Sequence, residues 1–262
     1  MTAPADSSLA VAERILPLLD LTSLNEGETE ADILALCRRA CTPHGPVAAV
    51  CLWPRWVSLA RRALSMLPSG KTIKLATVVN FPHGATAVDV VCAEVDQALR
   101  DGADEIDLVF PYRALMAGDA QTGFEMASRC RQRLNGQALK VILETGELAQ
   151  PALIRQAAQI AVEAGADFLK TSTGKVPVNA TLDSARLLLE VIQSNDRSVG
   201  LKIAGGIRTL AEARAYLGVA DELMGSDWVN PTHFRFGASS LLGDLLVALN
   251  GELSGPANKG AY

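Results

Sequence analysis

The sequence predicts an α/β fold, a (β/α)8 or TIM barrel with extra N-terminal helices. Segments rich in β-branched residues recur from about residue 47 onward, and segments with helical periodicity lie between them. A small-residue turn, an Ala-Asp pair and an apolar run also recur, in "RDGADEIDLVF", "EAGADFLKTST" and "LGVADELMGS". The competing architecture, a doubly wound open sheet, would normally have fewer strands and a G-x-G-x-x-G motif after the first, which is absent after "VAAVCLW".

The eight expected strands occupy residues 47–53, 73–80, 105–110, 139–145, 167–173, 198–205, 221–226 and 234–240. The clearest helices between them are 87–102, 151–165 and 182–195, where Ala, Leu and Val recur at three- and four-residue spacing. Residues 1–262 are predicted to form one barrel domain. Residues 1–45, with helices near 9–20 and 29–40, are expected to be a helical extension packed on the barrel, and residues 251–262 a flexible tail.

Composition narrows the class of partner. The chain has 262 residues, 49% hydrophobic and 20% charged, and a net charge of −5 without basic clusters, so nucleic acid and acidic membrane surfaces are not expected partners. No apolar run approaches the roughly 18 residues of a spanning helix, and we expect a cytoplasmic protein with a small-molecule substrate. The five cysteines form no C-x-x-C pair and the three histidines lie far apart, so neither a metal site nor a disulfide framework is expected.

Two lysines stand inside apolar strands. Lys170 in "DFLKTSTGK" shares its parity with Phe168 and Ser172, and can project into the barrel near the C-terminal end of its strand, where barrel active sites lie. Lys202 in "VGLKIAGG" has a comparable height on the next strand. Two ammonium groups in one poorly solvated cavity repel, so one becomes a free, nucleophilic amine more readily. Alternatively, the lysines point outward between helices or pair with a buried carboxylate.

Asp107 in "DEIDLVFPY" is a third inward candidate. It is flanked by Ile106 and Leu108, where a bare anion would be costly. Beside Lys202 it could relay protons, whereas alone it would be only an ion-pair partner.

Three short segments after late strands suit a phosphate group. They are Gly174 and Lys175, Gly205 and Gly206, and Ser239 and Ser240. Backbone amides freed by glycine, serine hydroxyls and a helix N-terminus all favour dianions. Singly each segment is also an ordinary strand-to-helix connector, but together they lie where barrels commonly bind phosphate.

Seven segments resemble the deoxyribose-phosphate aldolases, class I aldolases with a (β/α)8 fold. They are "LLDLTSLN", "ATVVNFPHG", "GADEIDLVFPYRALMAG", "LETGEL", "GADFLKTSTGK", "AGGIRT" and "RFGASSLL", in order between about residues 17 and 242. The resemblance implies a carbon–carbon lyase of deoxyribose phosphate catabolism, which reversibly cleaves 2-deoxy-D-ribose 5-phosphate into D-glyceraldehyde 3-phosphate and acetaldehyde. It implies a lysine Schiff base and no metal or organic cofactor. Because relatives are often dimers, a homodimer is one expectation.

The resemblance also implies residue roles. The match of "FLKTSTGK" makes Lys170 the Schiff-base lysine, "VGLK" makes Lys202 the second lysine that depresses its pKa and assists proton transfer, and "DEID" makes Asp107 part of that relay. Tyr262 matches a frequent C-terminal tyrosine that helps abstract the acetaldehyde methyl proton; the alternative is a tail residue without a role. Further expected substrate-site residues are Asp20, Thr22, Cys51 and Thr171, with Cys51 alternatively a small core residue.

Other functions remain open at this point. Another Schiff-base aldolase of the same barrel class would act on a different phosphorylated aldehyde. A non-catalytic sugar-phosphate-binding barrel would keep the phosphate loops but not need the strand lysines. A metal-dependent aldolase or isomerase would need clustered His, Glu or Asp ligands, which the scattered histidines do not favour.

Overall fold

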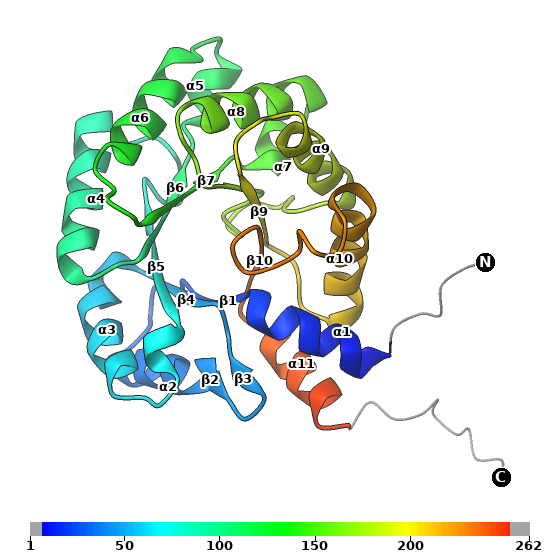
Figure 1. Ribbon diagram of the computed structural model, residues 1–262. Helices are drawn as coiled ribbons and strands as arrows, with labels where there is room; N and C mark the ends of the chain where they lie inside the picture. Colours follow the sequence, from blue (N-terminus) through cyan, green and yellow to red (C-terminus); the bar gives the residue numbers. More distant parts are fainter. Residues whose placement is uncertain (1–6, 252–262) are drawn as a thin grey trace, which may run out of the picture.

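Eight parallel strands form a closed barrel in the computed structural model, which describes residues 7–251 (Figure 1). The order of the strands around the barrel is β1–β10–β9–β8–β7–β6–β5–β4. In chain order they are β1 (Leu19–Ser23), β4 (Ala49–Leu52), β5 (Lys74–Val79), β6 (Glu105–Val109), β7 (Ala138–Ile142), β8 (Phe168–Lys170), β9 (Gly200–Ala204) and β10 (Phe234–Ala238). The predicted (β/α)8 barrel is confirmed.

Helices surround the strands, and a short hairpin, β2 (Cys41–Thr42) with β3 (Gly45–Pro46), lies outside them (Figure 1). The helices are α1 (Ser8–Ile15), α2 (Glu30–Ala40), α3 (Val57–Ser65), α4 (Val88–Asp101), α5 (Tyr112–Met116), α6 (Gln121–Arg131), α7 (Thr145–Leu148), α8 (Pro151–Glu163), α9 (Leu182–Gln193), α10 (Leu210–Met224) and α11 (Leu241–Leu249). α1 packs beside α10 and α11. Within residues 7–251, no helix has both the length and the apolar character that crossing a membrane requires.

The repeated Gly-Ala-Asp segment is a real structural unit at two of its three sites. Gly102 and Gly165 each have φ +99°, which ends α4 and α8 with the left-handed conformation that glycine adopts readily. Asp104 then accepts a hydrogen bond from a backbone amide of β5, and Asp167 accepts one from β7, each at 2.8 Å. The same turn therefore starts β6 and β8 and ties each to its preceding strand.

The prediction of a strand at residues 221–226 is wrong. In the third copy of the repeat the glycine stands one residue further from the Ala-Asp pair, and Gly218 lies inside α10 instead of ending it. Leu217 and Ala220 continue the buried face of this helix, which runs to Met224. Helical periodicity thus extends through a segment that resembles a strand entry.

The missing strand comes from the N-terminal stretch. Residues 9–20 and 29–40 do contain helices, as predicted for an extension at 1–45, but Leu19–Ser23 is β1, a barrel strand between β10 and β4, and does not belong to an extension. "LDLTS" alternates apolar and polar residues with period two, as a strand with one face toward the helices does. The predicted tail 251–262 falls almost entirely outside the described residues.

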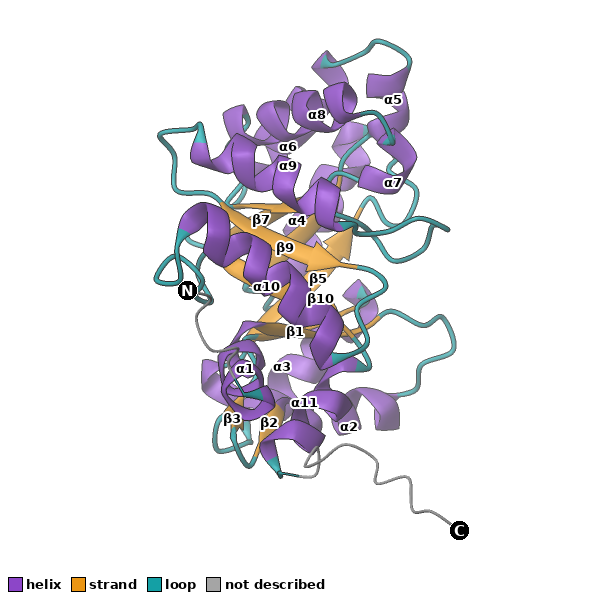
Figure 2. Ribbon diagram, turned by 90° about the vertical axis from the view of Figure 1, so that its right-hand side faces the viewer, coloured by secondary structure: helices purple, strands orange, loops and turns teal. Residues whose placement is uncertain are grey.

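Small residues make room inside the barrel for large ones. A Cβ at Gly237 would lie 2.9 Å from Lys202 Cε, and a Cβ at Gly200 would lie 2.4 Å from Phe168 Cε1. Both glycines face long side chains from neighbouring strands, so the interior is filled by interdigitation. Figure 2 shows the arrow of β9 pointing toward the loops on the right-hand side of the view.

Gly200→Ala should destabilise the barrel by about 1–3 kcal/mol, because the new methyl group overlaps the Phe168 ring and lies 2.7 Å from the His233 carbonyl oxygen. Gly218→Ala is the matched control: its methyl group meets nothing within 4 Å in α10, and it should stabilise by about 0.5–1 kcal/mol. Urea unfolding followed by circular dichroism measures both. Equal changes of the same sign would contradict this account of the interior.

Candidate active site

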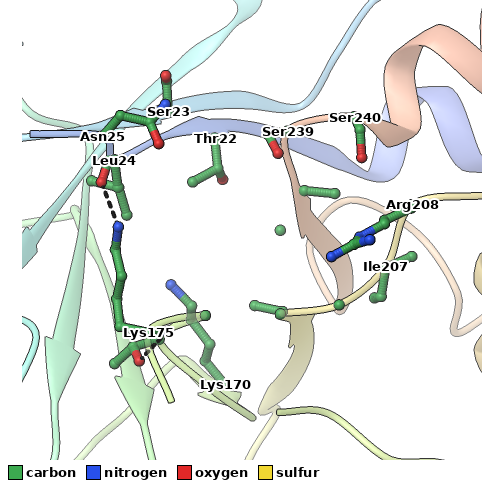
Figure 3. Close-up of a pocket in the computed structure, with 17 residues that line it drawn as sticks. Thr22, Ser23, Leu24, Asn25, Lys170, Lys175, Ile207, Arg208, Ser239 and Ser240 are labelled. Atoms are coloured by element: carbon green, nitrogen blue, oxygen red, sulfur yellow. Dashed lines mark hydrogen bonds between the residues drawn. The ribbon is translucent and has the colours of Figure 1, made fainter. Parts of the chain in front are cut away.

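A cavity of about 250 Å³ opens at the C-terminal end of the barrel, among the ends of β1, β8, β9 and β10 (Figure 3). Because all the strands are parallel, their C-terminal ends and the loops that follow meet at this face. The cavity lining includes eight of the residues predicted from the sequence: Thr22, Lys170, Gly174, Lys175, Gly205, Gly206, Ser239 and Ser240.

Lys170 and Lys202 lie side by side on β8 and β9, in direct register. Lys170 is 3% exposed and lines the cavity, whereas Lys202 is 0% exposed and lies below it. Both amines donate to one oxygen, Asp107 Oδ2, from 2.7 Å and 2.8 Å. The lysines do not point outward, and the other alternative, a buried ion pair with a carboxylate, is present at both.

Four more charged side chains lie deeper in the barrel. Lys140 on β7 donates to the other oxygen of Asp107, Oδ1, at 3.0 Å and also to Glu105. Arg235 on β10 donates to Asp20 Oδ1 at 2.6 Å and to Glu105 Oε1 at 3.1 Å. Asp20 Oδ2 lies 2.6 Å from Lys202 Nζ, so the two groups of ion pairs form one network.

The pKa values of the three lysines in the network shift in different directions. Burial lowers the pKa of Lys170, and the neighbouring Lys202 lowers it further, so that Asp107 does not restore the ordinary value. Burial also acts on Lys202 and Lys140, but nearby carboxylates outweigh it and raise the pKa of both amines. Of these three amines, the one that opens on the cavity is the one most ready to lose its proton.

The two aspartates of the network are held as carboxylates. Burial would raise the pKa of Asp107, but Lys140, Lys170 and Lys202 together hold it well below the ordinary value of 3.8. Burial likewise opposes ionisation of Asp20, and Lys202 and Arg235 lower its pKa. An uncharged amine beside a fixed anion and a fixed ammonium can attack carbonyl carbon and exchange protons.

The rim of the cavity carries positive charge and hydrogen-bond donors. Arg208 was not among the predicted residues, and Figure 3 shows its guanidinium extending into the cavity opposite Lys170. Lys175 also lines the cavity, and its amine donates to the Leu24 carbonyl at 2.8 Å. Ser239 and Ser240 lie at the N-terminus of α11. Such a rim can hold an anion.

Three predicted substrate-site residues do not line the cavity. Asp20 is 0% exposed and lies two residues below Thr22 on β1, where it pairs with Lys202 and Arg235. The Thr171 hydroxyl bridges β8 to the backbone of Ala204 at 3.0 Å, because it follows Lys170 with the opposite parity. Cys51 is buried, with its sulfur 4.0 Å from Asp107 Oδ2. Burial raises the pKa of its thiol. Tyr262 lies outside the described residues.

Sequence reasoning missed three of the four residues of the deeper network, since only Asp20 was expected at the site. Lys140 in "LKV" follows the same pattern as Lys170, Glu105 shares the parity of Asp107, and Arg235 stands between two phenylalanines. Each breaks an apolar strand, and that signal could have found them.

Glu144 was also missed. It follows β7 with φ +56°, and both its carboxylate oxygens accept hydrogen bonds from Thr173 in the loop after β8. Burial raises its pKa. A strained backbone and a buried carboxylate thus fix the loop that carries part of the cavity wall.

Between residues 7 and 251, no three His, Cys, Asp or Glu side chains are arranged to hold a metal ion. The metal-dependent alternative therefore has no ligand set in that part of the chain.

Residues 14–244 match the family model of the DeoC/LacD family aldolases. Solved structures from Toxoplasma gondii ME49 and Coccidioides immitis, each described as a putative deoxyribose-phosphate aldolase, are similar at 29% and 27% identity, with TM-scores of 0.87 and 0.78. Each match covers 93% of this chain, and 97% and 87% of the other chain respectively. A deoxyribose phosphate aldolase from Aeropyrum pernix, described as having a unique tetrameric structure, shares the fold at 24% identity, with a TM-score of 0.70 and 92% of both chains covered.

Asp107→Asn should lower the free energy of unfolding at neutral pH by about 3–5 kcal/mol, because buried lysines lose their carboxylate partner. Since the folded protein lowers the pKa of Asp107, the wild-type protein loses this stabilisation as the pH falls below about 4. The variant should therefore lose less stability than the wild type over that range. Urea titrations between pH 7 and pH 3 test this, with the exposed Asp196→Asn as the control that should match the wild type.

Proposed function

Because the chain belongs to the DeoC/LacD aldolase family, we propose that it is a class I aldolase that reversibly cleaves 2-deoxy-D-ribose 5-phosphate into D-glyceraldehyde 3-phosphate and acetaldehyde. The observation that carries the proposal is the Lys170 amine. It opens on a cavity that is also lined by Arg208 and by Ser239 and Ser240, and burial and Lys202 lower its pKa. The names of the similar structures from Toxoplasma gondii and Coccidioides immitis support the choice of substrate.

The reaction would begin at Lys170. Its uncharged amine attacks the C1 aldehyde of the open-chain sugar phosphate, and loss of water from the resulting carbinolamine gives a protonated imine. The imine cation then draws electrons from the neighbouring carbon–carbon bond. An ammonium could not start this sequence, because it has no free electron pair.

Asp107 and Lys202 would handle the protons. Cleavage of the C2–C3 bond leaves its electron pair in an enamine on Lys170, while the C3 hydroxyl loses a proton and becomes the aldehyde of glyceraldehyde 3-phosphate. Asp107 Oδ2 lies between the two lysine amines, and a water molecule in the cavity could carry the proton from the hydroxyl to this group. Protonation of the enamine and hydrolysis of the imine then release acetaldehyde.

The phosphate would bind at the rim. Arg208, the amides of Gly205 and Gly206, and the hydroxyls of Ser239 and Ser240 all line the cavity. Binding energy at the phosphate would orient C1 toward Lys170. The homodimer and the cytoplasmic location expected from the sequence stay predictions.

Borohydride reduction in the presence of acetaldehyde should attach a two-carbon group to Lys170, because the imine is reduced to a stable secondary amine. Peptide mass mapping locates the adduct, and Lys170→Met is the control that should remain unmodified. A folded wild-type protein without an adduct would favour the non-catalytic sugar-phosphate-binding alternative. Loss of turnover with a chelator would favour metal-dependent chemistry.

Arg208→Gln should raise KM for 2-deoxy-D-ribose 5-phosphate by about tenfold or more, since the loss of one charged contact to phosphate is worth about 1.5–3 kcal/mol. Turnover of unphosphorylated 2-deoxy-D-ribose should change little, because it presents no dianion to the rim. The ratio of the two kcat/KM values is the measurement. An equal loss on both substrates would place Arg208 outside the phosphate site.

A further inference from the structure

The barrel interior holds an uneven set of charges. Three carboxylates and four basic groups contact one another there: Asp20, Glu105, Asp107, Lys140, Lys170, Lys202 and Arg235. All seven side chains are buried or nearly so. With every group ionised, the network would carry one excess positive charge in a poorly solvated space, which is costly. Loss of one proton from one lysine would balance it.

Lys140 contributes to this excess without reaching the cavity. It is 0% exposed, lies on β7 directly beside Asp107 in the register, and does not line the cavity. Its amine donates to Asp107 Oδ1 at 3.0 Å, which leaves Oδ2 to be shared by Lys170 and Lys202. The Lys140 amine also donates a hydrogen bond to Glu105, which accepts another from Arg235.

We propose that Lys140 is a positioning residue that keeps Lys170 an uncharged amine at neutral pH by engaging Asp107 from the side opposite to Lys170. Glu105 limits the effect of Lys140 on Lys170, because Glu105 and Asp107 compete for the same ammonium group. The inference rests on the proposed Schiff-base function of Lys170. It extends that function to a second layer of the barrel, which the substrate does not reach.

The other charged and titratable groups around Lys170 leave its charge dependent on Lys140. Lys202 on β9 opposes a charge on Lys170, and Asp107 on β6 favours one. Cys51 on β4 has a thiol whose pKa is raised by burial. Glu144, after β7, has both oxygens occupied by Thr173. Asp20 on β1 and Arg235 on β10 pair with each other across the lower network.

Lys140→Met removes a positive charge and frees Oδ1 of Asp107, so Lys170 should be protonated more readily. We expect the pH midpoint for formation of the acetaldehyde adduct on Lys170 to rise by about one unit, and the rate below the midpoint to fall about tenfold. Glu105→Gln removes a negative charge and should lower the midpoint. The double variant, Lys140→Met with Glu105→Gln, should return it toward the wild-type value.

The measurement is the initial rate of adduct formation on Lys170 with acetaldehyde and cyanoborohydride between pH 5 and pH 10, read by peptide mass mapping. Lys74→Met, an exposed lysine on β5, is the matched control for the loss of one positive charge and should not move the midpoint. Urea titrations verify folding. If Lys140→Met does not fold, Glu105→Gln and the double variant still have distinct expected midpoints.

The outcomes separate this inference from the proposed function. A wild-type protein that forms no adduct at any pH overturns the proposed function. A wild-type adduct whose midpoint is the same in all folded variants overturns the role of Lys140 and leaves the proposed function intact. Midpoints that move in opposite directions for Lys140→Met and Glu105→Gln, and return in the double variant, support the inference; a purely structural role would make the double variant worse.

Discussion

The site depends on one carboxylate, Asp107, held ionised in a space where an isolated anion would be costly. Three lysine amines contact it; Lys140 also contacts Glu105 and Lys202 also contacts Asp20, whereas Asp107 is the one carboxylate that pairs with Lys170 among the described residues. Lys140 donates a hydrogen bond to Oδ1 of Asp107, whereas Lys170 and Lys202 both donate to Oδ2. The surrounding charges raise the pKa of Lys140 and Lys202, whereas the pKa of Lys170, which shares this anion and is otherwise buried, is lowered.

The barrel is what makes this sharing possible. Each charged group comes from a different strand or from a different height on the same strand, and the register places Lys170 beside Lys202 and Lys140 beside Asp107. Glycine at position 237 leaves the volume that the Lys202 chain fills. Since all these strands are parallel and closed into a barrel, their register fixes the point at which each of these side chains enters the interior. The placement of the charge network therefore follows from the register of the sheet.

The sequence predicted the alternation of strands and helices, the inward lysines on β8 and β9, and the rim loops, because period-two patterns and glycine turns are local signals. The prediction failed for elements that can be recognised only once the sheet has closed into a barrel. β1 lies among helices in the sequence, and only closure against β10 and β4 identifies it. The resemblance predicted Asp20 as a substrate-site residue but gave no depth for it, because depth depends on the stagger between strands. Lys140 was missed although it breaks an apolar strand as Lys170 does, and only the structure shows that it shares Asp107 with Lys170.

The interior and the rim divide two tasks that a catalytic site must perform together. A lysine amine loses its proton more readily when it is buried away from water. Binding of a phosphorylated substrate instead requires an open surface, where hydrogen-bond donors can exchange water for the phosphate oxygens. Lys170, at 3% exposure, stands at the boundary between them, with the ion-pair network below and the cavity above. Under the proposed function, changes among Arg208, Ser239 and Ser240 would act on the surface that meets the substrate, while changes among Lys140, Glu105 and Asp107 would act on the amine. Substrate preference in such a barrel can therefore vary through its loops while the chemistry stays fixed in its strands.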